Sequence, residues 1–365
     1  MSSKSVVFFL PTLAGGGAER DTLTLAGHFA AKGHKVTLLL QRREGELLKA
    51  IPKTIRTVSL DQPRTLLAVF PLTAFLQQEK PDVLISSFGH NNIIAILARM
   101  ISGLQTRIIV CQHTSLSIES KFHTNWQYLF LPFLSRIFLP RAQGIVAVSQ
   151  SVANDLSKTA KLPINRVTII YNPVVTADFE ERMNEDISHP WFGSGIPVVL
   201  GVGRLVEEKD FATLIQAFAV VAQKYEVRLA IVGDGPLRQS LIDLTKKLGV
   251  NDLVMFLGYQ TNPLPFIRRA AVLAASSKHE GFGNALVEAL ACGTPVVSTK
   301  VGGAEEILKQ GSYGQLVPIG NPGELTKAIA ATLSNPLPKD FLKRRGMEFT
   351  AERAGELYAR LCGLE

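Results

Sequence analysis

Short apolar, β-branched runs alternate with helix-period runs along this 365-residue chain, and the alternation occurs in two series. Near-continuous apolar strands separated by helices are typical of parallel sheets covered on both faces. The first series predicts strands at residues 6–10, 35–40, 82–86, 107–111, 144–148 and 166–171, and helices at 22–32 and 91–101. Because one ordinary domain rarely reaches this length, we expect the second series to form a second domain.

An acidic stretch containing Gly and Pro, residues 176–197, separates the two series and predicts an inter-domain linker. The second series predicts strands at 198–202, 228–232, 253–257, 271–275 and 295–298, and helices at 211–225, 237–248, 285–291 and 323–334. We expect a first domain at 1–175, a second at 176–339, and a final helical segment, about 340–365, packing back on the first. Two doubly wound domains of this kind are expected to face each other across a cleft.

Composition narrows the class of partner without choosing one. The formal net charge is +8, which fits nucleic acid, an anionic membrane face or a phosphate-bearing small molecule. Three scattered cysteines argue against a disulfide framework and a zinc site, and they suit the cytoplasm. The first apolar run is too short for a signal peptide, and no apolar run is long enough to span a bilayer. We therefore expect a cytoplasmic protein that is soluble or lies on the membrane.

The most informative motif follows a predicted strand and opens a predicted helix at residues 276–295. Its glycine-rich loop, Gly281, Phe282 and Gly283, leads into Asn284, Ala285 and Leu286. Backbone N–H groups at a helix start, with glycines that permit close approach, form a site for phosphate.

Two glutamates flank this loop. Glu288 lies where it can accept hydrogen bonds from two ribose hydroxyls, and Glu280 lies where it can bind sugar hydroxyls. Two glutamates eight residues apart often occur by coincidence, so their spacing alone does not indicate a site. The strand–loop–helix context favours a binding site.

In each domain, the loop after the first strand is a further candidate for ligand binding. Arg204 and Lys209 follow the strand at 198–202, where two cations can stabilise the charge of a departing diphosphate; the alternative is solvated loop charges. Gly16 and Gly17, between the first strand and the first helix, let the backbone approach a ligand. Neither loop has the G-x-G-x-x-G spacing of dinucleotide-binding proteins, which weakens an oxidoreductase interpretation.

Together these motifs resemble those of the retaining family-4 glycosyltransferases. The resemblance rests on the E-x7-E pair Glu280 and Glu288 in E-G-F-G-N-A-L-V-E, on G-V-G-R-L-x-x-x-K and on G-G-G-A-E-R, and it covers essentially the whole chain. It implies the two-domain GT-B architecture and a nucleotide-diphosphate sugar donor, which we expect to be UDP-linked.

The resemblance also implies individual roles. Arg204 and Lys209 match the pyrophosphate-binding pair, Glu280 the residue that contacts the donor sugar, and Glu288 the ribose-binding glutamate, with the backbone from Phe282 to Leu286 lining the donor. His113, at the end of a first-domain strand, matches a histidine near the reacting centre. From the sequence alone, a single histidine there is more often structural.

The chain contains no Asp-x-Asp, the carboxylate pair through which many transferases hold a metal-bound diphosphate. Fixed cations can replace the metal. We therefore expect a metal-independent enzyme without a cofactor.

An aromatic and basic segment in the first domain suggests the acceptor. Residues 99–141 carry five basic residues against one acidic residue, interleaved with Phe, Leu, Trp and Tyr. Such a segment suits the headgroup boundary of an anionic bilayer, the inner face of the cytoplasmic membrane. A core helix of the first domain is the alternative, and Pro132 and Pro140 are expected to interrupt or kink it.

The segment resembles, more loosely, the acceptor-reading helix of bacterial polyprenyl-diphosphate-linked oligosaccharide transferases, among which one adds N-acetylgalactosamine. The resemblance implies a polyprenyl-diphosphate or glycan acceptor contacted by Lys121 and Arg136.

Rival interpretations share the same two-domain frame. A sugar-nucleotide epimerase or a soluble-acceptor synthase would not need the aromatic and basic segment. A non-catalytic nucleotide-sugar sensor would not need to keep Arg204, Lys209, Glu280 and His113 together. A nucleic-acid-binding module is raised only by the isoelectric point, and we expect none because the cations lie at strand ends.

Overall fold

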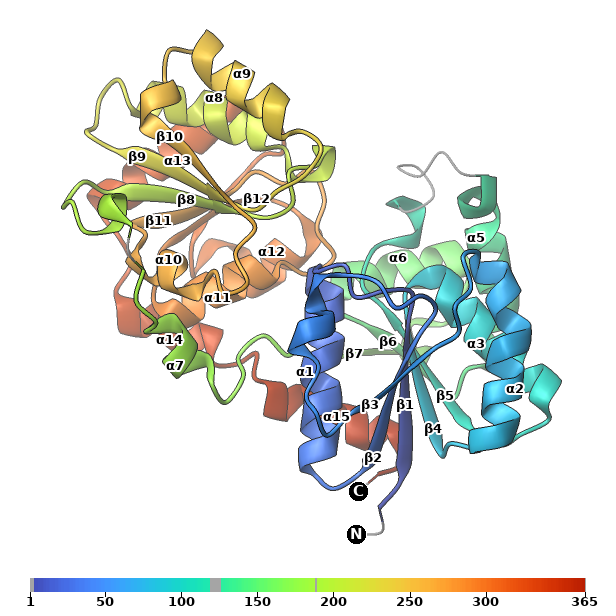
Figure 1. Cartoon of the computed structure of the whole chain (residues 1–365). Coiled ribbons are helices and arrows are strands. Elements are labelled where there is room, and N and C mark those ends of the chain that lie inside the picture. Colours follow the sequence, from blue (N-terminus) through green and yellow to red (C-terminus); the bar gives the residue numbers. More distant parts are fainter. Residues whose placement is uncertain (1–2, 119–125, 188, 365) are drawn as a thin grey trace. The chain divides into compact units, whose positions relative to one another are not determined.

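The computed structural model describes residues 3–118, 126–187 and 189–364, and the chain forms two compact units (Figure 1). The first unit runs to Pro173 and resumes at Thr350, and the second is Val174–Phe349. The return to the first unit therefore begins ten residues later than the predicted residue 340. The helix α14 (Lys339–Gly346) accounts for the difference, because it packs on α11 (Asn284–Cys292) of the second unit.

The first unit contains a parallel seven-stranded sheet in the order β3-β2-β1-β4-β5-β6-β7. Its strands are β1 (Ser5–Leu10), β2 (Lys35–Leu40), β3 (Arg56–Ser59), β4 (Val83–Ser87), β5 (Arg107–Gln112), β6 (Gly144–Ala147) and β7 (Val167–Ile169). All but the outer β3 and β7 are almost wholly buried, which explains their continuous apolar sequence. The sequence did not predict β3, because this short edge strand is exposed or half-buried throughout.

Helices cover both faces of this sheet. On one face α2 (Val69–Glu79), α3 (Gly89–Ser102), α5 (Trp126–Phe138) and α6 (Gln150–Ala160) pack in sequence against one another (Figure 1). On the other, α1 (Gly17–Ala31) packs against the returning α15 (Ala351–Cys362). The contact is close, because a Cβ on Gly355 would lie 2.3 Å from the His28 ring.

The second unit has a parallel six-stranded sheet in the order β10-β9-β8-β11-β12-β13. Its strands are β8 (Val198–Val202), β9 (Arg228–Val232), β10 (Val254–Gly258), β11 (Val272–Ala275), β12 (Val296–Thr299) and β13 (Gln315–Val317). Helices α8 (Phe211–Val221), α9 (Arg238–Lys247) and α13 (Pro322–Ser334) pack together, as do α10 (Leu264–Arg269), α11, α12 (Gly302–Ile307) and α14. The predicted linker region contains the short helix α7 (Phe179–Met183), which packs on α10.

Each sheet reverses its strand order at one place. In the first unit the reversal lies between β1 and β4, and in the second between β8 and β11. Ligands of open parallel sheets bind at the carboxyl ends of the strands at such a switch point. The GT-B class expected from the resemblance is thus confirmed at the level of two Rossmann-like sheets.

None of the helices in the described part of the chain is long and apolar enough to cross a bilayer.

Candidate functional site

In the second unit, two loops meet at the switch point. The loop after β8 carries Lys209 and the loop after β11 carries Glu280, and the Lys209 ammonium donates a hydrogen bond to Glu280 Oε1. Both side chains are only partly exposed, at 27% and 18%. The sequence predicted a role for each residue, one at the diphosphate and one at the sugar, but did not predict that they form an ion pair.

Two serines without a predicted role support this pair, one within the Glu280 loop and one between the two loops. Ser277 Oγ donates to the same Glu280 Oε1 at 2.8 Å. Ser276 Oγ donates to the backbone oxygens of Lys209 and Asp210, at 3.1 and 2.8 Å. Because both serines are buried, these bonds fix the position of the carboxylate and of the lysine backbone.

The glycine-rich loop ends in a helix start, as the sequence predicted. Gly283 precedes α11 with φ of +116°, a conformation that favours glycine, and no side chain caps the helix there. The amino end of α11, at Asn284 and Ala285, is suited to an anion, whereas the Leu286 amide already donates to Gly283 O at 3.0 Å. Glu288 lies in the second turn and is half-buried.

Two close backbone approaches, neither of them predicted from the sequence, shape this edge of the sheet. A Cβ on Gly233, after β9, would lie 1.9 Å from Gly203 O. A Cβ on Gly303, after β12, would lie 1.9 Å from the backbone oxygen of Phe282. The available signals were a glycine directly after β9 and the glycine pair that begins α12.

Arg204 is exposed on the loop that also carries Lys209. Phe282 is buried, and its ring packs edge-on against Phe349 with centroids 5.6 Å apart. The donor loop is therefore anchored by an aromatic contact, while Arg204 is accessible to solvent.

In the first unit, Gly16 and Gly17 lie at the switch point. Gly16 is the residue before α1 and Gly17 is its first residue, directly beyond the carboxyl end of β1. As in α11, no side chain caps the helix start.

His113 follows β5 at the same edge of this sheet. Its ring lies 5.8 Å from that of Phe88, a non-glycine residue with φ of +76°. Neither ring nitrogen is accessible, and neither has a hydrogen-bond partner among the described residues. Burial lowers the pKa of His113 to about 4, so the imidazole is neutral at physiological pH.

The predicted acceptor residues are only partly described. Arg136 is exposed on α5, whereas Lys121 lies outside the described residues. The helix α5 contains Pro132 and ends before Pro140. Leu131 and Ser135 are buried, while Phe130 and Phe133 are 54% and 60% exposed. The helix therefore contributes one face to the core and exposes another.

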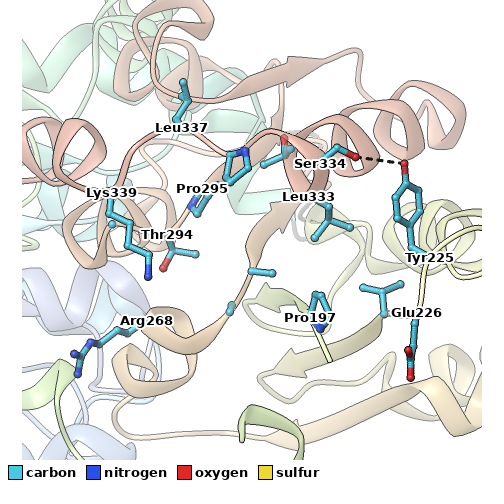
Figure 2. A pocket seen from close by; sticks show the side chains of 16 residues that line it. Pro197, Tyr225, Glu226, Arg268, Thr294, Pro295, Leu333, Ser334, Leu337 and Lys339 are labelled. Atoms are coloured by element: carbon cyan, nitrogen blue, oxygen red, sulfur yellow. Dashed lines mark hydrogen bonds between the residues drawn. The ribbon is translucent and has the colours of Figure 1, made fainter. Parts of the chain in front are cut away.

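A cavity of 420 Å³ lies elsewhere in the second unit (Figure 2). Its wall includes Pro197, Val227, Ala271 and Pro295, which directly precede β8, β9, β11 and β12. It therefore opens at the amino ends of the strands, the opposite edge from Lys209 and Glu280. The described residues include no cluster of three or more His, Cys, Asp or Glu side chains suited to a metal ion.

Comparison with known proteins relates both units to one group of enzymes. The family model "Glycosyltransferase Family 4" matches residues 15–178, and "Glycosyl transferases group 1" matches residues 187–348.

Two relatives come from Campylobacter jejuni. The N-acetylgalactosamine-N,N'-diacetylbacillosaminyl-diphospho-undecaprenol 4-alpha-N-acetylgalactosaminyltransferase is 31% identical over 67% of this chain, and the aligned part spans 65% of that relative. An α-1,4-N-acetyl-D-galactosaminyltransferase acting on GalNAc-alpha-(1->4)-GalNAc-alpha-(1->3)-diNAcBac-PP-undecaprenol is 28% identical, with 90% and 89% of the two chains aligned.

Among solved structures, Anabaena Alr3699/HepE in complex with UDP and glucose superposes with a TM-score of 0.80 at 21% identity, covering 99% of each chain. At that identity the likeness establishes the fold. With both family models matched in order on two Rossmann-like units, the chain belongs to the GT-B glycosyltransferases of family 4.

Proposed function

We propose that this protein transfers a sugar, a hexose or N-acetylhexosamine, from a UDP-linked donor to a polyprenyl-diphosphate-linked or glycan acceptor, with retention of configuration. The observation that carries the proposal is the Lys209–Glu280 pair, which joins the loops after β8 and β11 beside the start of α11. The pair brings a cation and a carboxylate together beside the amino end of a helix. A nucleotide-diphosphate sugar offers matching groups for all three.

The donor half of the reaction is assigned to the second unit. Arg204 and Lys209 bind the diphosphate, and the backbone of residues 281–286 lines the sugar and its phosphates. Glu280 accepts hydrogen bonds from sugar hydroxyls, and Glu288 from the ribose. Because Ser277 already fixes the Glu280 carboxylate, sugar hydroxyls meet a preorganised acceptor.

In the transfer step, the acceptor hydroxyl oxygen bonds to the anomeric carbon while the bond from that carbon to the diphosphate breaks. The electron pair leaves with the diphosphate, which also takes up the hydroxyl proton. Lys209 and Arg204 stabilise the growing negative charge, so no metal ion is required in this proposal. In the first unit, we assign a catalytic role to neutral His113 and a donor-binding role to the backbone at Gly16 and Gly17.

The acceptor half is assigned to the first unit and the membrane. Arg136, exposed on α5, and Lys121 contact the acceptor diphosphate. The exposed Phe130 and Phe133 beside Arg136 fit the headgroup boundary of the cytoplasmic membrane, where polyprenyl-diphosphate acceptors reside. Support comes from the relatives named above, whose substrates are undecaprenyl-linked.

The function is tested by ligand protection followed by transfer. A ligand that binds only the folded state raises its melting temperature, so UDP and UDP-sugars should protect the protein while GDP and ADP should not. The protecting UDP-sugar should then donate to an undecaprenyl-diphosphate-linked oligosaccharide, and the product's anomeric coupling should show retention. Activity should persist in excess EDTA. Rescue of a chelator-silenced enzyme by magnesium or manganese would overturn the metal-independent proposal, and protection by none of the nucleotides would overturn the donor assignment.

Gly303→Ala should weaken binding of UDP-sugar by at least about tenfold. The added Cβ meets a backbone oxygen, Phe282 O, which cannot rotate away as a side chain would. The donor loop must therefore shift from its position over α11. Calorimetric titration with the protecting UDP-sugar measures the effect.

Gly323→Ala provides the control in the same unit. It lies in the first turn of α13, where a Cβ would make only ordinary contact, 3.4 Å from the Asn321 side chain. It should bind donor as the wild type does. Equal affinities for both variants would show that the donor loop is not held by Gly303.

A further inference from the structure

A cluster of exposed apolar side chains occupies one end of the helical face in the first unit. Leu66 and Leu67 belong to the short helix η2 (Thr65–Ala68), and Phe70 lies in the first turn of α2. Phe70 is 71% exposed, and the two leucines are 53% and 51% exposed. The function proposed above does not use these residues, and none of the sequence motifs includes them.

The exposure is confined to the start of α2. Farther along the helix, Leu72, Phe75 and Leu76 are buried, while the outward positions carry Gln77 and Gln78. Beyond its first turn, α2 is thus an ordinary amphipathic helix. Three large apolar side chains in solvent at one end are therefore not explained by packing of the core.

The cluster and α5 share one neighbour, the helix α3. Both η2 and α5 pack against α3, and α2, α3 and α5 lie in a row (Figure 1). Because η2 follows the end of β3, it lies toward the carboxyl ends of the strands. Phe130 lies in the first half of α5, which also starts from that edge, and Phe133 lies just past its middle. His113 and Gly16 belong to the same edge of the sheet.

Arg64 is the only charged residue in the stretch from Gln62 to Gln78. Arg64 directly precedes η2 and is exposed, as is Arg136 on α5. The sequence has no Asp or Glu between Gln62 and Gln78, and none from residue 120 to 154. Exposed apolar side chains next to an arginine, in a stretch without acidic residues, complement an anionic lipid surface.

We propose that residues 64–70, the Arg64–Phe70 turn, form a second membrane-inserting element that enters the headgroup–acyl boundary of an anionic bilayer beside α5. This proposal rests on the function proposed above for its biological setting, while its geometry rests on the first unit alone. Two elements at one edge of the sheet fix the orientation of this unit on the bilayer. That orientation holds the His113 edge toward the lipid surface, where a diphosphate-linked acceptor is presented.

Site-directed labelling tests the insertion directly. The three native cysteines are all buried, so Phe70→Cys can be labelled selectively with the environment-sensitive fluorophore NBD. With vesicles of phosphatidylglycerol and phosphatidylcholine, its emission should rise and shift to the blue, and nitroxide lipids with a shallow spin label should quench it. The matched control is Ile164→Cys, also in the first unit and 48% exposed, but at the amino end of β7. Its emission should not change.

Removal of the apolar side chains tests the consequence. The triple variant Leu66→Ser, Leu67→Ser, Phe70→Ser should bind these vesicles at least about tenfold more weakly, since burying even one such side chain contributes that much. Its circular dichroism should match the wild type, because all three residues are mainly exposed. Transfer to an acceptor in vesicles should fall, while transfer to a soluble short-chain diphosphate acceptor should be retained.

The outcomes separate this proposal from the proposed function. Unchanged NBD emission at residue 70 in vesicle-bound protein would overturn the insertion and leave the enzymatic function standing. A dimer that dissociates in the triple variant would instead assign the cluster to a second copy of the chain, also overturning it. Failure of the wild type to transfer to either acceptor would refute the function, whereas NBD quenching would still establish insertion.

Discussion

Lys209→Met should lower kcat by roughly 10²–10³-fold, the typical loss when one donor to a developing charge is removed. The structure explains why Lys209 can have this effect: Glu280 already holds its ammonium at the switch point, so little side-chain freedom is lost when the diphosphate arrives. Arg204→Ala should reduce kcat by a similar factor because it removes the other predicted diphosphate cation. Single-turnover transfer from the UDP-sugar measures both effects.

The control and the double variant distinguish direct from indirect action. Lys246→Met removes an exposed lysine of α9 that pairs with Asp243 at 3.6 Å, and it should leave kcat unchanged. If Lys209 acts only by positioning Glu280, then Lys209→Met combined with Glu280→Gln should be no slower than Glu280→Gln alone. If it also binds the diphosphate, the double variant should be slower still. Wild-type turnover in Lys209→Met would refute the assignment.

The central strands could be predicted because burial on both faces demands continuous apolar sequence. Strands β1 and β8 illustrate this, since each reads as an apolar run and each is buried over most of its length. The strands β3 and β13 were missed for the complementary reason. Gln315–Val317 has only three residues, and its first two are exposed or half-buried at the sheet edge. Edge strands owe their conformation to the neighbouring strand, which the local sequence does not contain.

The candidate site could be predicted as a set of loops but not as a set of contacts. Motif spacing placed Lys209 after one strand and Glu280 after another, and the strand order explains why those loops are neighbours. Their ion pair joins residues 71 positions apart, so no local pattern encodes it. The bonds from Ser276 to the backbone of Lys209 and Asp210 and the glycine contact at Gly303 depend likewise on strand adjacency, whereas the bond from Ser277 to Glu280 is local.

The aromatic and basic segment shows a different limit. The sequence offered a membrane helix or a core helix as alternatives for it, and α5 is amphipathic enough to have a buried and an exposed face. Pro132, expected to interrupt or kink the helix, lies inside it. The exposed cluster at Phe70 could not be predicted, because a helix-period sequence does not show which turn of the helix other elements cover.

His113→Leu should make the first unit more stable and the enzyme about 10²-fold slower. Both ring nitrogens are buried without a partner among the described residues, and an unsatisfied buried polar group typically costs about 1–3 kcal/mol. A leucine of similar size avoids that cost. The loss of turnover follows if the neutral imidazole donates a hydrogen bond at the reacting centre, where one donor contributes a comparable factor.

The pH dependence provides an independent readout of the same residue. Because burial lowers the pKa of His113 from 6.5 to about 4, the unfolded chain binds a proton more readily than the folded one between these values. Stability is therefore complete above pH 6.5, falls as the pH drops toward 4, and loses roughly 3 kcal/mol in all from this group. Urea unfolding of His113→Leu should show a smaller decline over that interval than the wild type.

Activity and stability together decide the role of His113. His34→Leu, at a half-buried histidine outside the candidate site, should keep wild-type turnover. If His113→Leu is more stable and equally active, the histidine is a structural residue of the strand end, the alternative that the sequence left open. If it is more stable and slow, the protein keeps a buried imidazole at a cost to its own folding, and that cost is explained by a hydrogen bond that forms only with bound substrate.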